Sequence, residues 1–206
     1  MKQTLYSSRS NLYLGFHGCD KAVGEKILRG ESLKYSSNSY DWLGHGIYFW
    51  ENNEQRALQF AREAAKRKLT SIKEPFVIGA VIDLGYCLDL TDSECLFELR
   101  QSYEAFRDAF VKAGKTLPCN KNIGENGDLL WRDLDCAVIE YEHTINKEAN
   151  VRPFDSVRGV FVEGDNLFPG SGIKEKNHIQ ICIRNPNCIK GYFLPRKKDD
   201  GYSSPE

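Results

Sequence analysis

The chain has 206 residues, a length typical of one domain or of one domain with an insertion. Its 28 basic and 29 acidic side chains nearly balance, which excludes the broad positive field of a general nucleic-acid binder. The seven cysteines show no CxxC pair and no zinc-ligand spacing, and no stretch resembles a signal peptide or a membrane span. We therefore expect a cytoplasmic protein with reduced thiols, no metal and no membrane partner.

The first predicted elements are a strand over 12–18, LYLGFHG, and a helix directly after it. Asp20 is a good N-cap for this helix, and Gly30 is a good stop. A lone histidine such as His17 is most simply a satisfied strand-end residue. Its place at the junction of strand and helix, with a glycine after it, also suits the binding of a planar amide.

The second pair of predicted elements begins at GHGIYFW, residues 44–50. The aromatic and β-branched run predicts a buried strand, and a glycine on each side of His45 could let a ligand or another backbone come close. We assign no role to His45 itself. A helix follows over residues 51–68, with Asn52 or Asn53 as its N-cap.

The rest of the chain predicts one long strand, a helical block and three more strands. The strand covers residues 76–90 and is apolar enough for burial on both faces. The predicted helices cover 93–114 and 128–147, and the later strands cover 157–164, 178–184 and 188–193. This order indicates an α+β fold. We expect a single domain over 1–195, with 90–150 as a helical insertion and 196–206 as a polar tail.

Three segments could meet in one site: GFHG, GHGIYF and the late strand HIQICI. Strand alternation places His178, Gln180 and Cys182 on one face of the late strand, opposite three isoleucines. Polar side chains on a strand between apolar runs must face solvent, a partner or a cleft. Each segment alone has an ordinary packing interpretation.

Together, and in this order, these segments resemble the ADP-ribosyltransferase fold of the diphtheria toxin and poly(ADP-ribose) polymerase type. The matching residues are FHG (16–18) with the helix KILRGESL, GHGIYF (44–49) with its helix, and the strand pair that ends in IKGYF. The match covers 12–70 well and 157–195 loosely. It implies split antiparallel sheets around an NAD cleft, and NAD as the substrate.

The resemblance also implies roles for individual residues. His17 would bind the adenosine-side ribose, and the backbone of Gly18 would hold the nicotinamide carboxamide. Tyr48 would stack on the nicotinamide ring, Gly46 would let the strand approach NAD, and Phe60 on the following helix is the best match for a second ring. Such a site orients NAD and stabilises developing charge.

The third motif departs from the family, which has a glutamate there. Alignment on IKGYF places His178 at that position, and Gln180 is an equally good candidate. The neighbouring carboxylates are Glu163 and Glu175. Because the glutamate is replaced, transfer of single ADP-ribose units is expected and chain synthesis is not.

The sequence therefore predicts a mono-ADP-ribosyltransferase that modifies a macromolecule, RNA, DNA or protein, as a toxin or defence effector with a possible antitoxin or inhibitor protein. The basic stretch 61–73 could contact nucleic-acid phosphates. Three alternatives stay open: an inactive NAD- or ADP-ribose-binding module, an RNA 2′-phosphotransferase on the same fold, and an interaction domain whose helical block docks a partner.

Overall fold

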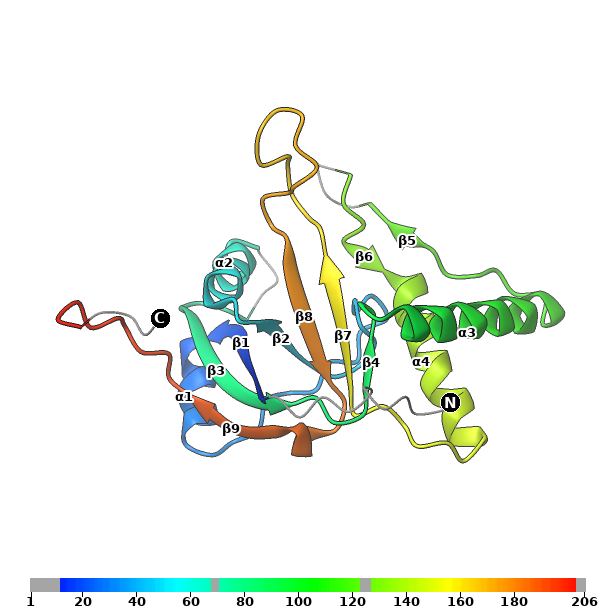
Figure 1. Cartoon of the computed structure of the whole chain (residues 1–206), viewed down its shortest axis with the longest axis horizontal. Coiled ribbons are helices and arrows are strands. Elements are labelled where there is room, and N and C mark those ends of the chain that lie inside the picture. Colours follow the sequence, from blue (N-terminus) through cyan, green and yellow to red (C-terminus); the bar gives the residue numbers. More distant parts are fainter. Residues whose placement is uncertain (1–11, 68–70, 123–126, 203–206) are drawn as a thin grey trace.

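The computed structural model describes residues 12–67, 71–122 and 127–202. Predictions for the first eleven residues, for part of the basic stretch 61–73 and for the end of the tail lie outside this part. Figure 1 shows a twisted sheet with helices on both of its faces and a helical block beside it.

The elements follow the predicted order along the chain, except that two short strands lie between the helices of the helical block. The strands are β1 (Leu12–Asp20), β2 (Ile47–Glu51), β3 (Pro75–Asp83), β4 (Cys87–Asp89), β5 (Asn120–Lys121), β6 (Trp131–Arg132), β7 (Ser156–Phe161), β8 (His178–Ile183) and β9 (Ile189–Phe193). The helices are α1 (Lys21–Leu28), α2 (Glu54–Ala65), α3 (Ser93–Lys112), α4 (Asp133–Glu148) and the short 3-10 helix η1 (Pro186–Cys188).

The main sheet has seven strands in the order β4-β7-β8-β2-β1-β3-β9, and β5 and β6 form a separate pair. All neighbours in the main sheet are antiparallel except β4 and β7, which are parallel. The predicted α+β class is therefore confirmed. The helical block, α3 to α4, lies between β4 and β7 in the chain (Figure 1).

Local signals explain where most elements begin and end. The Asp20 side chain accepts from the Ala22 N–H at the start of α1, as predicted, and Asn53 caps α2 by accepting from Arg56. The predicted single strand over 76–90 is wrong, because the chain turns at Gly85, where φ is +59°. Asp155 accepts from the Tyr86 N–H at 2.9 Å and holds this turn between β3 and β4.

The two central strands, β1 and β2, pair over a short distance only. Their pairs are Gly15 with Glu51 and Phe16 with Trp50, next to a hydrogen bond from the Asn52 N–H to the Leu14 carbonyl. Just before β2 begins, Gly46 pairs with Ser36 and not with β1, and the two residues exchange two backbone hydrogen bonds of 2.8 and 3.0 Å. Between these two pairings, next to Tyr48, β1 and β2 separate, and we call this gap in the sheet the split.

The sheet has two different faces. Phe49 and Ile78 point to the face on which α1 packs through Ile27, and we call this the α1 face. Trp50 and Val77 point to the other face, where α2 packs through Ala57, and we call this the α2 face. Farther along the same face a second core joins the sheet to the helical block, with α4 contributing Ile139.

Within the described ranges, no helix is both long enough and apolar enough to cross a membrane. All seven cysteines lie in these ranges, and all are free thiols.

The first test concerns Gly46, whose absent side chain lets β2 approach β8. A Cβ there would lie 2.4 Å from Cys182 Sγ and 2.7 Å from the Ile183 carbonyl oxygen. Gly46→Ala should therefore lower the free energy of unfolding, measured in urea, by about 1–3 kcal/mol. Gly191→Ala is the matched control, since a Cβ at Gly191 on β9 meets nothing within 4 Å. Equal stability of the two variants would contradict the packing argument.

Candidate active site

His17 lies at the split between β1 and β2. Its Nδ1 is 2.7 Å from the Tyr48 carbonyl oxygen, to which it donates. Nε2 has no hydrogen-bond partner among the described residues. Burial lowers the pKa of His17, although the bond to Tyr48 opposes this. The ring is therefore neutral at pH 7 and offers a free acceptor at Nε2.

Gly18 borders the same split through its backbone. The Leu14 carbonyl accepts from Asn52 on the β2 side, so by strand alternation the N–H and C=O of Gly18 also point toward β2. At this position β2 has already diverged. A Cβ on Gly18 would lie 2.2 Å from the Ala57 carbonyl oxygen on α2, so only glycine fits under this helix. The predicted pair His17 and Gly18 thus offers a ligand in the split one side-chain acceptor, His17 Nε2, and the backbone N–H and C=O of Gly18.

The Tyr48 side chain is held away from this edge. Its hydroxyl donates to the Gly44 carbonyl at 2.5 Å and accepts from the Leu43 N–H at 2.8 Å, and its ring packs in the core that contains Cys182. Alternation along β2 puts this ring on the α2 face, while His17 contacts Phe49 on the α1 face, with 5.9 Å between ring centroids. Tyr48 meets His17 through its carbonyl and not through its ring.

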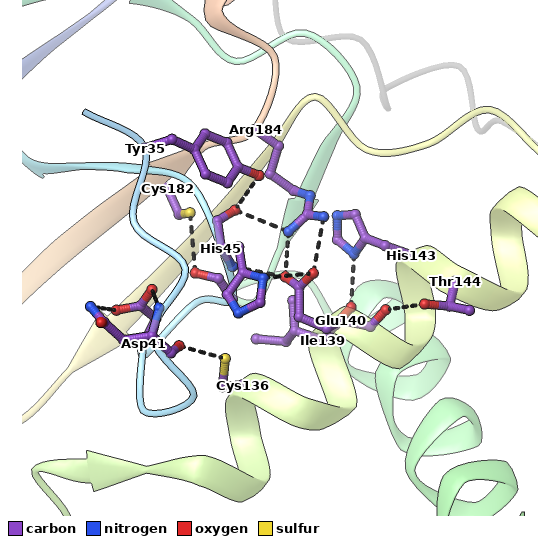
Figure 2. A network of polar contacts seen from close by, with 12 residues as sticks. Tyr35, Asp41, His45, Cys136, Ile139, Glu140, His143, Thr144, Cys182 and Arg184 are labelled. Carbon is purple, nitrogen blue, oxygen red and sulfur yellow. Dashed lines mark hydrogen bonds and ion pairs between the residues drawn. The ribbon is translucent and has the colours of Figure 1, made fainter. Parts of the chain in front are cut away.

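The GHG turn is held by a polar network that the sequence analysis missed (Figure 2). The His45 N–H donates to Glu140 Oε1 at 2.8 Å, and Arg184 donates to both Glu140 oxygens at 2.5 and 3.2 Å. The His45 carbonyl accepts from Tyr35 and Arg184 at 2.9 and 3.0 Å. Burial raises the pKa of Glu140, but these donors outweigh it and bring the pKa below its ordinary value.

Both glycines of the GHG turn allow this close packing, because a side chain at either position would collide with its neighbours. Gly44 has φ of +73°, and a Cβ there would lie 2.6 Å from Glu140 Oε1. Gly46 allows the approach of β8 described above. The structure therefore places the predicted ligand-facing Gly46 against protein, and the turn is anchored to α4 and to the end of β8.

The two third-motif candidates lie side by side on the α2 face and bind each other. The Gln180 amide donates to His178 Nε2 at 2.9 Å, and His178 Nδ1 donates to the Lys176 carbonyl at 2.6 Å. Both residues are buried. Burial lowers the pKa of His178 to about 4, and the cationic Arg56 and Arg132 add to this while the Lys176 carbonyl opposes it.

A carboxylate does lie at the third motif, and it comes from the segment after β7. Glu163 Oε2 accepts from Arg56 at 3.1 Å and is 3.4 Å from His178 Nδ1. Both charged side chains are buried, with exposed fractions of 9% for Arg56 and 7% for Glu163. Burial raises the pKa of Glu163, and Arg56 opposes the shift. Glu175, the other predicted carboxylate, is exposed on the loop before β8.

Aromatic rings surround His178. Trp42, Trp50 and Phe161 lie with their ring centroids 6.3, 6.5 and 5.7 Å from that of His178. The predicted second ring, Phe60, packs on Trp50 at 5.0 Å. Phe60 therefore belongs to this cluster on the α2 face and does not face Tyr48 across a cleft in this conformation.

The structure thus separates the predicted residues into two groups. His17 and the backbone of Gly18 border the split, while Tyr48, Phe60, His178 and Gln180 pack on the α2 face. Glu51 is a carboxylate on the same face as His17, and Arg158 binds it at 2.6 and 2.9 Å.

Metal chemistry has no candidate ligands in the part of the chain that the structure covers, since no group of three His, Cys, Asp or Glu is arranged to hold an ion there.

Comparison with known proteins finds one similar protein, whose name gives no function. The chain is 27% identical over 192 residues to the Uncharacterized protein MJ0359 of Methanocaldococcus jannaschii, and the alignment covers 85% of this chain and 83% of the relative. No protein-family model matches the chain. No solved structure matches it either. The ADP-ribosyltransferase resemblance therefore stays a prediction.

The buried His178 predicts how stability depends on pH. Its pKa is about 4 in the folded protein against an ordinary 6.5, so the unfolded chain binds more protons between these values. The free energy of unfolding should rise with pH across this window. His178→Gln should reduce the rise between pH 5 and pH 7.5, measured in urea, by about 1–2 kcal/mol. An unchanged rise would show that His178 is not buried in its neutral form.

Proposed function

We propose that the protein binds NAD at the split between β1 and β2 and transfers ADP-ribose from it to a macromolecule. The observation that carries this proposal is the arrangement of His17 and Gly18. A neutral histidine has Nδ1 bound to the Tyr48 carbonyl and Nε2 free, beside a glycine whose backbone faces the gap. These are the groups that the family resemblance requires at this position.

The chemistry follows from these groups. Nε2 of His17 accepts from a ribose hydroxyl, and the N–H and C=O of Gly18 pair with the carbonyl and amino group of the carboxamide. In the reaction, the bond between nicotinamide and the ribose C1 breaks, and its electron pair leaves with neutral nicotinamide. A nucleophile on the acceptor then bonds to C1 and loses its proton. The protein mainly positions NAD and stabilises the positive charge that develops on the ribose.

Glu163 is our choice for the carboxylate that stabilises this charge. It lies 3.4 Å from His178, which with Gln180 is one of the two candidates for the position of the family's glutamate. To take this role, Glu163 must first be released from Arg56, because its carboxylate is now buried in an ion pair with Arg56. Glu51 is the competing carboxylate, since it shares the α1 face with His17.

A second function has specific support: a module that binds NAD or ADP-ribose without turnover. His178, Gln180 and Glu163 are buried and bound to protein partners, as expected of structural residues. In that case His17 and Gly18 would still bind the ligand. Measuring binding and turnover separately distinguishes the two functions.

The central test measures NAD binding by calorimetry, and nicotinamide release with labelled NAD and a cell lysate as acceptor source. His17→Ala should weaken NAD binding and reduce release, each about tenfold or more, because the hydrogen bond from the ribose hydroxyl to Nε2 is lost. His45→Ala is the control, since its backbone contacts to the GHG turn survive. Protease and nuclease treatment of the labelled product then identifies the acceptor class.

Several outcomes of this test are decisive. NAD binding without release or label transfer, in wild type and with every lysate, supports the binding module against the enzyme. Equal loss in His17→Ala and His45→Ala would remove the site assignment, provided that both variants remain folded. Absence of NAD binding by the wild type contradicts both functions.

The carboxylate is tested by a separate set of variants. Glu163→Gln should reduce nicotinamide release more than tenfold, because an amide cannot balance the developing charge of the ribose. Glu175→Gln is the control, because Glu175 is exposed on the same loop and should retain the wild-type rate. If Glu51→Gln loses nicotinamide release while Glu163→Gln keeps the normal rate, the carboxylate that stabilises the charge is Glu51, on the α1 face. Circular dichroism on each variant verifies folding.

A further inference from the structure

A cavity of about 440 Å³ lies between the helical block and β7, on the α2 face. It is lined by α3, by α4, by the end of β7 and by the segment that contains Trp42. Its volume is in the range of small-molecule sites. The proposed reaction uses none of its lining residues, so the cavity needs an explanation of its own.

The lining is mainly aliphatic. Six of the eight aliphatic residues among the described lining are Leu90, Leu96, Leu99, Leu134, Val138 and Ile139. Leu96 is 49% exposed at the rim, although it is apolar. A flexible chain of methylene groups suits such a surface, because its burial removes apolar area from water.

Two arginines give the cavity a positive charge. Arg132 lies flat over Trp42 and Phe161, with its Cζ 4.5 and 4.9 Å from the ring centroids, and donates to Asp135 at 3.0 Å. Arg100 is exposed and forms no hydrogen bond or ion pair with any described residue. Among the described residues of the lining Asp135 is the single acidic side chain, so the two guanidinium groups leave these residues with a net charge of +1.

We infer that this cavity binds a small amphipathic carboxylate, with an aliphatic body between α3 and α4 and its acid group on Arg100. A guanidinium group pairs with a carboxylate through two parallel N–H bonds, and Arg100 has its donors available. Charge complementarity therefore selects the acid over the corresponding alcohol. The inference does not depend on the proposed reaction with NAD, because the two sites share no residue.

Decanoate is the probe, with decan-1-ol as its neutral counterpart, both used below micelle-forming concentrations. Calorimetry should show decanoate binding more tightly than decan-1-ol. NMR of ¹³C-labelled methyl groups should show shifts at Leu99, Leu134 and Val138 that saturate with the same affinity. Absence of decanoate binding, or saturating shifts only outside the cavity, overturns the inference.

Two pairs of variants on α3 separate the cavity from its surroundings. Arg100→Gln should weaken decanoate binding about fivefold and leave decan-1-ol unchanged, while Arg107→Gln, outside the lining, should change neither. Leu96→Glu should weaken decanoate about tenfold by loss of apolar contact and by repulsion, while Phe97→Glu, 64% exposed and outside the lining, should not.

The variants can also overturn the inference. Equal binding of decanoate and decan-1-ol, unaffected by Arg100→Gln, contradicts the carboxylate and leaves an apolar cavity only. Equal loss in Leu96→Glu and Phe97→Glu contradicts the location. All four substitutions are at exposed or partly exposed helix positions, so folding is expected to survive, and thermal unfolding of each variant verifies this.

Discussion

The separation of β1 from β2 is the constraint on which the candidate site depends. Their pairing covers Gly15 and Phe16, and Ser36 then replaces β1 beside Gly46. Between these two pairings the Tyr48 carbonyl would be left without a partner, and burying an unpaired carbonyl costs free energy. The His17 side chain satisfies it at 2.7 Å, which sets the tautomer of the ring and leaves Nε2 free. An ordinary continuous ladder would have consumed the backbone of Gly18 and left no site.

The opposite end of β2 is held as firmly, but by side chains. Glu140 of α4 and Arg184 beyond β8 fix the GHG turn (Figure 2). The Tyr48 hydroxyl closes the turn by donating to the Gly44 carbonyl. The helical block is therefore part of the structure that positions β2, although it lies far from β2 in sequence. Ile139, next to Glu140 on α4, also lines the cavity, so one helix supports both the turn and the cavity wall.

The α2 face presents a different kind of chemistry. There Arg56, Glu163, His178 and Gln180 form a buried polar cluster among aromatic rings, with Arg56 Nε and Nη1 and Trp50 Nε1 buried and unpaired. Unpaired buried donors are costly, so this cluster lowers the stability of the fold. In the proposed reaction, Glu163 would have to be freed from Arg56 before its carboxylate could act.

What the sequence by itself determined is local. Caps at Asp20 and Asn53, helical periodicity and strand alternation predicted the four α-helices, most of the longer strands and the α+β class, because these signals act over a few residues. The short strands β5 and β6 and the break between β3 and β4 were not predicted. That His17 and Gly18 lie next to each other on the first strand was predictable for the same reason. Only the tertiary structure decided the partners: Glu140 meets His45 across 95 residues and Glu163 meets Arg56 across 107. Alternation indicated which residues share a face of one strand, but not that His17 and the Tyr48 ring lie on opposite faces of the sheet. That depends on the register between β1 and β2, which is set by long-range packing and has no signal in either segment.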